Sequence, residues 1–471
     1  MRRVKTIVVL LVMVGLGFFA SNAFSAEGKG EVAPAVNPVA AEAIRGWLTS
    51  EAVHLNTIEA GHGFNDLRPL KKVFKDVRVV GLGEATHGSR EFFQFKHRML
   101  EFLVEEMGFT VFAIEASYPA CFNINDYVLY GKGDRAKALA SQGFWTWDTN
   151  EVSDMIDWIR DYNKRAPENK RVKFLGFDLQ HFEQSFDIIL DYLKRVAPYH
   201  VKTAEDTLKP FRLELSAYSQ RSPEDKARAR ASLDELIGFL SFNQTGFIRQ
   251  TSPGEFEKVM QHARILAQFD DSYGKAMDPK LASEPGVRDR DYYMAENILY
   301  LLNAEPAGTR MVVWAHNGHI STSKLGDSSA MGSYLHNWLG GAYYALGFTF
   351  KQGSFQSREM SEKVIGGLKE FTVGAPPEGS VDWYFALPGI DHYLVDFRSA
   401  PKDGPVGAWL GENHPMRSVG SGFSMKWSEQ QYMQPLVLKD NFDGMFFIDQ
   451  TTRARPNPTG MRGPMEPPGS K

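Results

Sequence analysis

Seven short apolar runs, rich in Val, Ile and Phe, constrain the fold of this chain more than any other feature. The runs are 77–82, 110–114, 172–177, 311–315, 343–350, 393–397 and 445–448. Continuous apolar runs of this length are typical of strands buried on both faces of a sheet. Between them lie stretches with helical spacing, for example 89–107. This alternation predicts a three-layer α/β fold, with a parallel or mixed sheet flanked by helices.

One long stretch departs from the alternation of strands and helices. Residues from about 185 to 305 have a nearly all-helical pattern, interrupted by turns near Pro223 and Pro253. We interpret this stretch as a helical lobe inserted into one large domain that spans 41–450. The following residues, 452–471, are rich in Pro and Gly. That composition predicts a disordered tail.

The N-terminus has the pattern of a bacterial export signal. Basic residues at positions 2, 3 and 5 precede an apolar run at 7–20 and small residues around 23–26. This order predicts a signal peptide at 1–26, followed by a flexible leader at 27–40. The apolar run is shorter than the roughly 20 residues that a membrane span needs. We therefore expect a periplasmic or secreted protein with no stable membrane span after signal removal; an uncleaved anchor is the alternative.

Charge and cysteine content narrow the possible partners. The chain has 53 Lys and Arg against 57 Asp and Glu, for a formal net charge of −4. A mildly acidic chain argues against nucleic acid as a partner. Cys121 is the only cysteine, so the chain has no internal disulfide and its core must stabilise it. We expect a buried thiol at this position, because no histidine lies near it in sequence.

Titratable residues follow four of the predicted strands. In chain order they are Glu84 with His87, Glu115, Asp178, and His316 with His319. Ligands of open α/β sheets bind outside the carboxyl ends of the strands. If these four strands are parallel neighbours, their titratable side chains meet in one cleft. A charge at a buried strand end costs free energy unless it is paired or used, so the set predicts a functional site.

His87 is the centre of the predicted site. It follows a strand and precedes a helix, and the positive end of a helix dipole disfavours an imidazolium. A neutral imidazole accepts a proton from water, and Glu84 or Glu115 could hold its tautomer. The imidazoles of His316 and His319 could donate hydrogen bonds to a developing oxyanion, or one could protonate the leaving alcohol. We predict that these five residues are catalytic.

Seven further residues are candidates for contact with the substrate. They are Arg90, Lys96, Tyr118, Trp145, Trp147, Asp178 and Tyr334. The aromatic members either form an apolar wall for a bulky substrate or pack under the sheet edge. The basic members either face the site and balance its carboxylates or lie on a solvated helix face. The carboxylate either contacts substrate or accepts backbone hydrogen bonds at its own turn.

The alternatives to this site are a metal centre and the catalytic motifs of other enzyme classes. Glu, Asp and His are ligands of Zn²⁺ and Mn²⁺, so the same residues could hold a metal ion. The sequence has no HExxH motif and no cysteine pair, and we expect neither metal nor cofactor. The absence of GxSxG disfavours a serine hydrolase. The run at 81–83 lacks the third glycine of a dinucleotide fingerprint, because Thr86 stands in its place.

In its motifs the chain resembles the erythromycin esterase family. The motifs are VVGLGEATHG at 79–88, FKHR at 95–98, FAIEA at 112–116, FD at 177–178, RD at 288–289, MAEN at 294–297, AHNGH at 315–319, GSYL at 332–335 and GSF at 353–355. The resemblance extends from about residue 40 to residue 450. Each motif is weak alone, but their combination and order are specific. Lys96 departs from the pattern, because macrolide-resistance members of the family carry Arg there.

The resemblance implies a metal-independent hydrolase. The residue matching His87 is the base that activates water in the family, and those matching Glu84, Glu115, His316 and His319 are essential. Founding members open the lactone ester of macrolide antibiotics and thereby confer resistance. Other members have no established substrate and are labelled succinoglycan-biosynthesis-like. A small-molecule ester or lactone is therefore the expected substrate.

Three hypotheses follow from the sequence. The first is an esterase or lactonase that uses His87 as its base. The second is a metal-dependent hydrolase that uses the same cleft. The third is a non-catalytic binding protein of the cell envelope, which the aromatic segment 144–147 and the export signal motivate. We rank the third last, because a binding protein does not need so many titratable groups at strand ends.

Overall fold

The computed structural model describes residues 36–213, 217–218, 220–275, 287–325, 328–361 and 365–457. The predicted signal peptide lies outside the described residues. The predicted leader extends too far, because helix α1 (Pro38–Glu51) begins within it. The Asn37 side chain caps this helix by accepting a hydrogen bond from Val39 N–H over 3.0 Å. No helix in the described ranges is long and apolar enough to cross a membrane.

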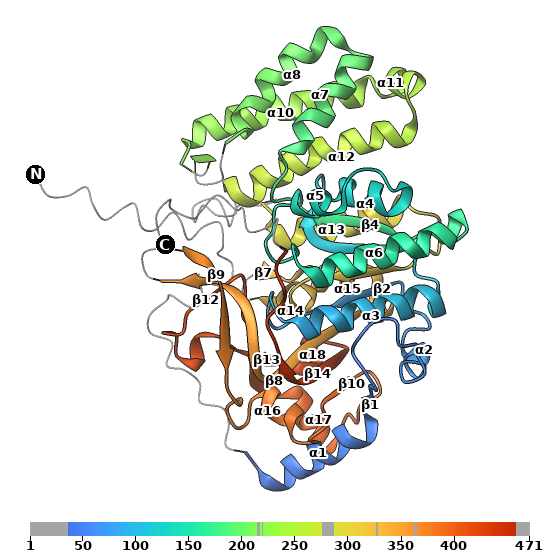
Figure 1. Cartoon of the computed structure of the whole chain (residues 1–471). Helices are drawn as coiled ribbons and strands as arrows, with labels where there is room; N and C mark the ends of the chain where they lie inside the picture. The colour runs from blue at the N-terminus through green and yellow to red at the C-terminus, as the bar shows by residue number, and fades with distance from the viewer. Residues whose placement is uncertain are drawn as a thin grey trace, which may run out of the picture.

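A mixed ten-stranded sheet forms the centre of the described part of the chain (Figure 1). Its main order is β1 (Val53–His54), β10 (His392–Asp396), β14 (Gly444–Thr451), β8 (Tyr343–Met360), β2 (Val79–Leu82), β5 (Met311–Trp314), β3 (Val111–Ser117) and β4 (Lys173–Asp178). The strands from β14 to β4 are parallel, whereas β10 and β1 are antiparallel to their neighbours. All seven predicted runs form strands, which confirms the α/β prediction with a mixed sheet.

Strand β8 is much longer than its apolar run predicts. Its second half still buries Phe355 in the core, and it pairs with β9 (Ile365–Val373) in antiparallel orientation and with β12 (Gly422–Phe423) in parallel orientation. This half contains more polar residues than the first half, so the apolar pattern ends although the hydrogen-bonded ladder continues. The extension lies next to the loop that follows β2, because Gln356 N–H donates to the Gly88 carbonyl over 3.0 Å.

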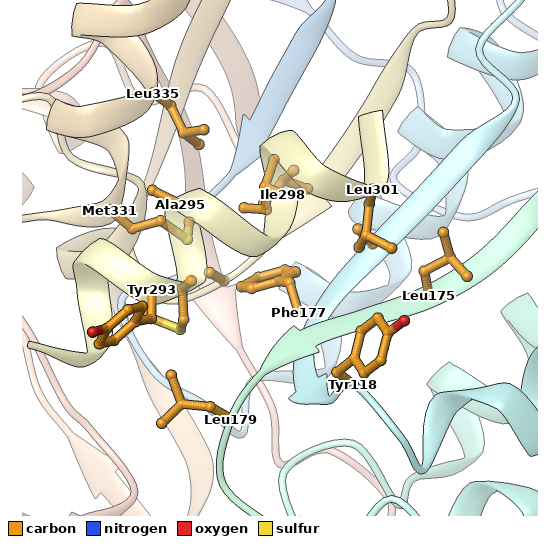
Figure 2. Packing of buried hydrophobic residues seen from close by; sticks show 14 of the residues in the cluster. Tyr118, Leu175, Phe177, Leu179, Tyr293, Ala295, Ile298, Leu301, Met331 and Leu335 are labelled. Carbon is orange, nitrogen blue, oxygen red and sulfur yellow. The ribbon is translucent and has the colours of Figure 1, made fainter. Parts of the chain in front are cut away.

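Helices cover both faces of the sheet, as the three-layer prediction requires. Alternate strand residues point to opposite sides, so Val80 and Trp314 pack with α3 (Arg90–Met107), α4 (Cys121–Tyr130) and α6 (Asn150–Arg165). Phe177 lies on the other side, under α13 (Arg290–Asn303), where Ile298 and Leu301 contact the sheet (Figure 2).

Outside the predicted lobe, the other helices and strands are α2 (Leu70–Val73), α5 (Arg135–Ala140), α14 (Asn317–Ile320), α15 (Met331–Leu339), α16 (Val381–Ala386), α17 (Gly404–Gly411), α18 (Leu438–Asn441), β6 (Lys324–Leu325), β7 (Ser328–Ser329), β11 (Asn413–Arg417) and β13 (Met433–Val437).

Helices also make up the described part of the predicted lobe, at the top of Figure 1. They are α7 (Gln184–Val196), α8 (Val201–Leu208), α10 (Pro223–Phe242), α11 (Gln244–Gln250) and α12 (Pro253–Phe269). The prolines at 223 and 253 each occupy the first helical position, where a missing N–H is tolerated. Ser222 and Ser252 cap these two helices through their hydroxyl oxygens. The turns that were predicted near Pro223 and Pro253 are therefore the positions at which helices α10 and α12 begin.

The segment Thr452–Asn457, which we call the C-terminal strap, corrects the prediction of a disordered tail. Ala454 is buried, and Asn457 is 7% exposed. Every residue type in the strap is common in disordered chains, so composition gave the wrong expectation. The strap is ordered because its backbone and side chains bond to α3, α6 and their preceding loops. The rest of the predicted tail, 458–471, lies outside the described residues.

Candidate active site

The four strands that end in titratable residues are adjacent and parallel. Their order is β2, β5, β3, β4, and Trp314 of β5 pairs with both Leu82 of β2 and Ile114 of β3. The loops after these strands therefore leave the same edge of the sheet. This is the arrangement on which the sequence-based hypothesis depends.

Glycines in the motif after β2 allow two loops to pack closely. A Cβ atom on Gly83 would lie 2.1 Å from the Oδ1 atom of Asn317, and one on Gly88 would lie 2.0 Å from the Gln356 carbonyl oxygen. The Asn317 side chain both donates to the Phe348 carbonyl and accepts from the Phe348 N–H, over 2.8 and 3.0 Å. These contacts fix the loop of His87 between the loop after β5 and strand β8.

Glu84 holds the His87 ring in one tautomer. His87 Nδ1 lies 2.6 Å from Glu84 Oε1, and Glu84 Oε2 accepts hydrogen bonds from Lys96 Nζ over 2.7 Å and Trp314 Nε1 over 2.9 Å. A carboxylate with these donors only accepts, so the proton between the two groups is assigned to Nδ1. Nε2 of His87 is therefore the basic nitrogen. Of the two carboxylates considered from sequence, it is Glu84 that contacts the His87 ring.

Lys96 is buried beside Glu84, and its contact with substrate stays a prediction. The residue is 0% exposed, and its ammonium lies 4.2 Å from the centre of the Trp314 ring. Burial lowers the pKa of Lys96 to about 8, although Glu84 and Glu115 favour its charged form. Lys96 is buried because it lies on the face of α3 that packs against the sheet. Its side chain acts as the buried counterion of Glu84.

His316 is a neutral imidazole beside the base. Its ring centre lies 4.9 Å from that of His87, at an interplanar angle of 50°. Burial, with the nearby His87 and His319, holds the pKa of His316 well below its ordinary value. Its Nδ1 accepts the Gly318 N–H over 3.2 Å, which places the ring proton on Nε2. His316 therefore has a neutral N–H donor next to the base.

A second group of charges lies beside His316. Arg290 binds Asp178 through two hydrogen bonds, Nε to Oδ1 over 3.0 Å and Nη2 to Oδ2 over 2.7 Å, and Nη2 also donates to Glu115 Oε1 over 2.7 Å. His319 bridges Asp291, at 2.8 Å from Nδ1, and Glu115, at 3.3 Å from Nε2. Three carboxylates thus surround two cationic side chains in a buried network.

The charges in this network shift each other's pKa values. Burial disfavours the charged form of Glu115, but His319 and Arg290 outweigh it and hold the pKa of Glu115 well below its ordinary value. Burial also opposes the imidazolium of His319, yet Asp291 and Glu115 raise its pKa to about 10. The two cations therefore favour the ionised form of Glu115, and the two carboxylates favour the imidazolium of His319 against the Arg290 Nη1 atom, which lies 3.2 Å from its Nε2. The other oxygen of Glu115 accepts the backbone N–H of His316 over 3.1 Å, which links the network to the residue that carries the neutral imidazole.

The raised pKa of His319 predicts how stability depends on pH. Its ordinary value is 6.5 and its folded value is about 10, so its stabilising effect is complete below pH 6.5 and is lost as the pH rises through about 10. We expect the Tm difference between the wild type and His319→Gln to shrink steadily over that window. Thermal melts at several pH values measure this difference. A difference that stays constant from pH 6.5 to 10 would show that His319 is neutral in the fold.

One of the aromatic candidates, Trp147, lies against His87. Trp147 is buried, its ring is edge-on to the His87 ring at 5.7 Å and 88°, and its Nε1–H donates to the Glu115 carbonyl over 2.8 Å. This tryptophan packs against the base, as the packing alternative predicts. Trp145 is half-buried in the same segment, and its contact with substrate stays a prediction.

The other two aromatic candidates, Tyr118 and Tyr334, have aromatic neighbours of their own. Tyr118 is 3% exposed and lies against Phe122 and His262. Figure 2 shows it among the core residues near Leu175 and Leu301, and its contact with substrate stays a prediction. The ring belongs to the hydrophobic core beneath the helices that cover this face of the sheet. Tyr334 is half-buried and contacts Tyr292 and Trp338 at ring-centre distances of 5.2 and 5.8 Å. Substrate contact by Tyr334 stays a prediction.

The polar candidates Arg90 and Asp178 have protein partners. Arg90 Nε lies 3.7 Å from Glu151 Oε1 at the start of α6. Asp178 accepts the N–H groups of Leu179 and Gln180 over 2.7 and 3.3 Å, in addition to the Arg290 guanidinium. Asp178 has 0% exposure, and these contacts agree with the alternative in which it accepts hydrogen bonds at its own turn; its contact with substrate stays a prediction. The pairing of Arg90 with Glu151 favours a role in the fold.

Sequence reasoning missed Arg290 and Asp291, which complete the charge network. The available signal was the charged run RDRD at 288–291, just before an apolar helix. Asp289 caps that helix by accepting the Tyr292 N–H over 3.0 Å, and this places Arg290 and Asp291 in its first turn. Within the described residues, no group of three or more His, Cys, Asp and Glu side chains has an arrangement that could hold a metal ion.

The fold and the site together define a class of protein. An α/β sheet with three imidazoles and several carboxylates at its carboxyl edge has the donors, acceptors and charges of an acid–base catalyst. A family model described as erythromycin esterase matches residues 104–451. The chain belongs to this family. Glu115, His316 and His319 fall within the matched residues, whereas Glu84 and His87 precede them.

Individual relatives agree with this assignment. Erythromycin esterase type II of Escherichia coli is 25% identical over 431 residues, which cover 86% of this chain and 97% of that protein. The putative hydrolase YbfO of Bacillus subtilis is 24% identical over 86% of this chain and 90% of its own length. A crystal structure of a Bacillus cereus protein superposes with a TM-score of 0.78 at 26% identity, covering 88% of this chain and 99% of that one. Membership of the family supports a hydrolase that acts on a small molecule.

Proposed function

We propose that this protein hydrolyses carboxylic esters or lactones with water that His87 activates. The observation that carries the proposal is the Glu84–His87 contact of 2.6 Å, which leaves Nε2 as the basic atom. The His87 side chain is 11% exposed, whereas that of Glu84 is fully buried. The base therefore keeps access to a water molecule while its orienting partner does not.

The proposed reaction has two steps. In the first, His87 Nε2 takes a proton from water as the water oxygen attacks the carbonyl carbon, giving a tetrahedral intermediate. The Nε2–H of His316 stabilises the developing oxyanion. In the second, the bond from carbon to the alcohol oxygen breaks, and the protonated His87 returns its proton to that oxygen. The products are a carboxylic acid and an alcohol, which stay joined when the substrate is a lactone.

The charge network supports the neutral donor in this proposal. Glu115 accepts the backbone N–H of His316 and is kept ionised by Arg290 and His319. Because the ring of His316 is neutral, it donates a hydrogen bond without competing with His87 for the proton. His319 has both ring nitrogens beside carboxylates, so we assign it the electrostatic role rather than proton transfer.

The names of relatives guide the choice of substrates. One relative is an erythromycin esterase, and a solved structure that superposes with a TM-score of 0.76 at 25% identity is described as a succinoglycan biosynthesis protein. Macrolides and acylated saccharides therefore both belong in the test. We propose export to the periplasm or beyond on the basis of the N-terminal pattern, so the substrate is one that the protein meets outside the cytoplasm.

An ester and lactone screen tests the proposed function. Purified protein is expected to release acid from at least one member of a panel of simple esters, lactones, macrolides and acylated sugars, and to keep its rate in a chelator. Loss of the rate in chelator and its return with Zn²⁺ or Mn²⁺ would favour the metal-dependent alternative. Binding of a panel member without turnover would favour the non-catalytic alternative.

A further inference from the structure

The C-terminal strap contacts both flanks of His87, although it lies just beyond the residues that the family model matches. We propose that the strap positions the His87 ring for proton transfer. This inference rests on the proposed function, in which His87 is the base. The residues that carry it are Ala454 and Asn457, which we call positioning residues because neither is bonded to the catalytic cluster itself.

The first flank is the backbone directly after His87. The Ala454 N–H donates to the Gly88 carbonyl over 2.8 Å, and the Gln356 N–H donates to the same oxygen over 3.0 Å. The Arg90 N–H donates to the Thr452 carbonyl over 2.9 Å. The strap and strand β8 therefore hold the Gly88 peptide from two directions. Because Gly88 directly follows His87, a shift of the Gly88 peptide at either contact is expected to move His87.

The second flank is the aromatic ring that packs on the base. Asn457 Nδ2 donates to Asp148 Oδ1 over 2.8 Å and contacts Ser153 Oγ at 3.1 Å, and its backbone N–H donates to the Asp148 carbonyl over 3.0 Å. Asp148 follows Trp147, whose ring is edge-on to His87 at 5.7 Å. Asn457 therefore fixes the segment that sets the position of the ring beside the base.

The strap connects these two flanks through a few residues of extended chain. Bridges at Ser89–Arg453 and Thr149–Pro456 show that it runs beside both backbones. Catalytic groups are sensitive to placement, since a shift of about 1 Å can lower a rate roughly a hundred-fold. Loosening the strap is therefore expected to change the chemistry of His87 before it unfolds the protein.

The test compares two buried asparagines in the full-length protein. Asn457→Ala removes the anchor of the strap. Asn163→Ala is the matched control, because Asn163 is equally buried and its side chain bonds the backbone of Val128 and Val172 through three hydrogen bonds far from the strap. Ala454→Pro is a second test variant, since proline removes the N–H that Gly88 accepts. Each variant is measured for Tm, for kcat and KM on the best ester, and for the NMR signals of isotope-labelled histidine rings.

The expected result separates positioning from simple stability. Asn457→Ala and Ala454→Pro should lower kcat by about ten-fold to a hundred-fold with little change in KM, shift the pH profile of kcat, and alter the ring signals of His87. Asn163→Ala should lower Tm at least as much and leave kcat and those signals unchanged. Wild-type kcat and unchanged His87 signals in both strap variants would overturn the inference. If the wild type hydrolyses nothing, the proposed function fails, and the ring signals alone decide whether the strap positions His87.

Discussion

Replacing His87 with alanine is expected to lower kcat/KM by at least about a hundred-fold, because general base catalysis typically contributes 10²–10⁴-fold. The variant loses the nitrogen that receives the proton from water but keeps the buried contacts of Glu84 with Lys96 and Trp314. Its fold is therefore expected to persist. Initial rates on the best substrate of the screen, together with a thermal melt, measure the effect.

His97→Ala is the matched control for this experiment. His97 is a buried histidine on α3 that contacts Trp158 and lies 3.7 Å from Glu101, away from the catalytic cluster. Its replacement should reduce stability without reducing the rate. Equal rates in the wild type and His87→Ala would refute the mechanism, even if the protein is an esterase.

Replacing Arg290 with methionine is expected to destabilise the fold by about 3–5 kcal/mol, because removal of one partner leaves buried charges unpaired. Asp178 would lose its hydrogen-bonded cation, and Glu115 would keep only His319. The pKa of Glu115 would rise, since Arg290 is one of the charges that lower it. Urea denaturation of the variant and the wild type measures the loss in the free energy of unfolding.

Two further variants calibrate the Arg290 experiment. Arg290→Lys keeps the charge but not the bidentate contact with Asp178, so its loss of stability should lie between zero and that of Arg290→Met. Arg195→Met breaks an exposed ion pair with Glu255 and should change stability little. A loss of less than about 1 kcal/mol in Arg290→Met would mean that the carboxylates are protonated or solvated in the fold.

The strand ends of the site could be predicted from sequence because an apolar run, which marks a buried strand, is followed there by a titratable residue. Apolar runs mark strands that are covered on both faces, and the polar residue that ends each run stands out against them. Glu84, Glu115 and His316 were found in this way, and parallel neighbours brought them together. The sequence left Glu84 and Glu115 as alternatives for the carboxylate that contacts the His87 ring, and in the structure it is Glu84.

Contacts between distant segments could not be predicted in the same way. Arg290 bonds residues 112 and 175 positions before it, and no local pattern indicates such a pairing. Lys96 was expected near the substrate, but it lies on the face of α3 that packs against the sheet, where it contacts Glu84. The strap was misassigned because its order depends on partners about 300 residues away, such as Glu151 and Asp148, and not on its composition.

The position of β2 in the sheet also has a consequence for how the chain acquires its structure. This strand pairs on one side with β5 and on the other with β8, and the Glu84 carboxylate accepts a hydrogen bond from a residue 230 positions later. During synthesis, both edges of this apolar strand lack their partners until most of the polypeptide has emerged. Such non-local pairing makes folding slow and leaves intermediates prone to aggregation. The group of side chains around His87 is thus one of the last parts of the molecule to assemble.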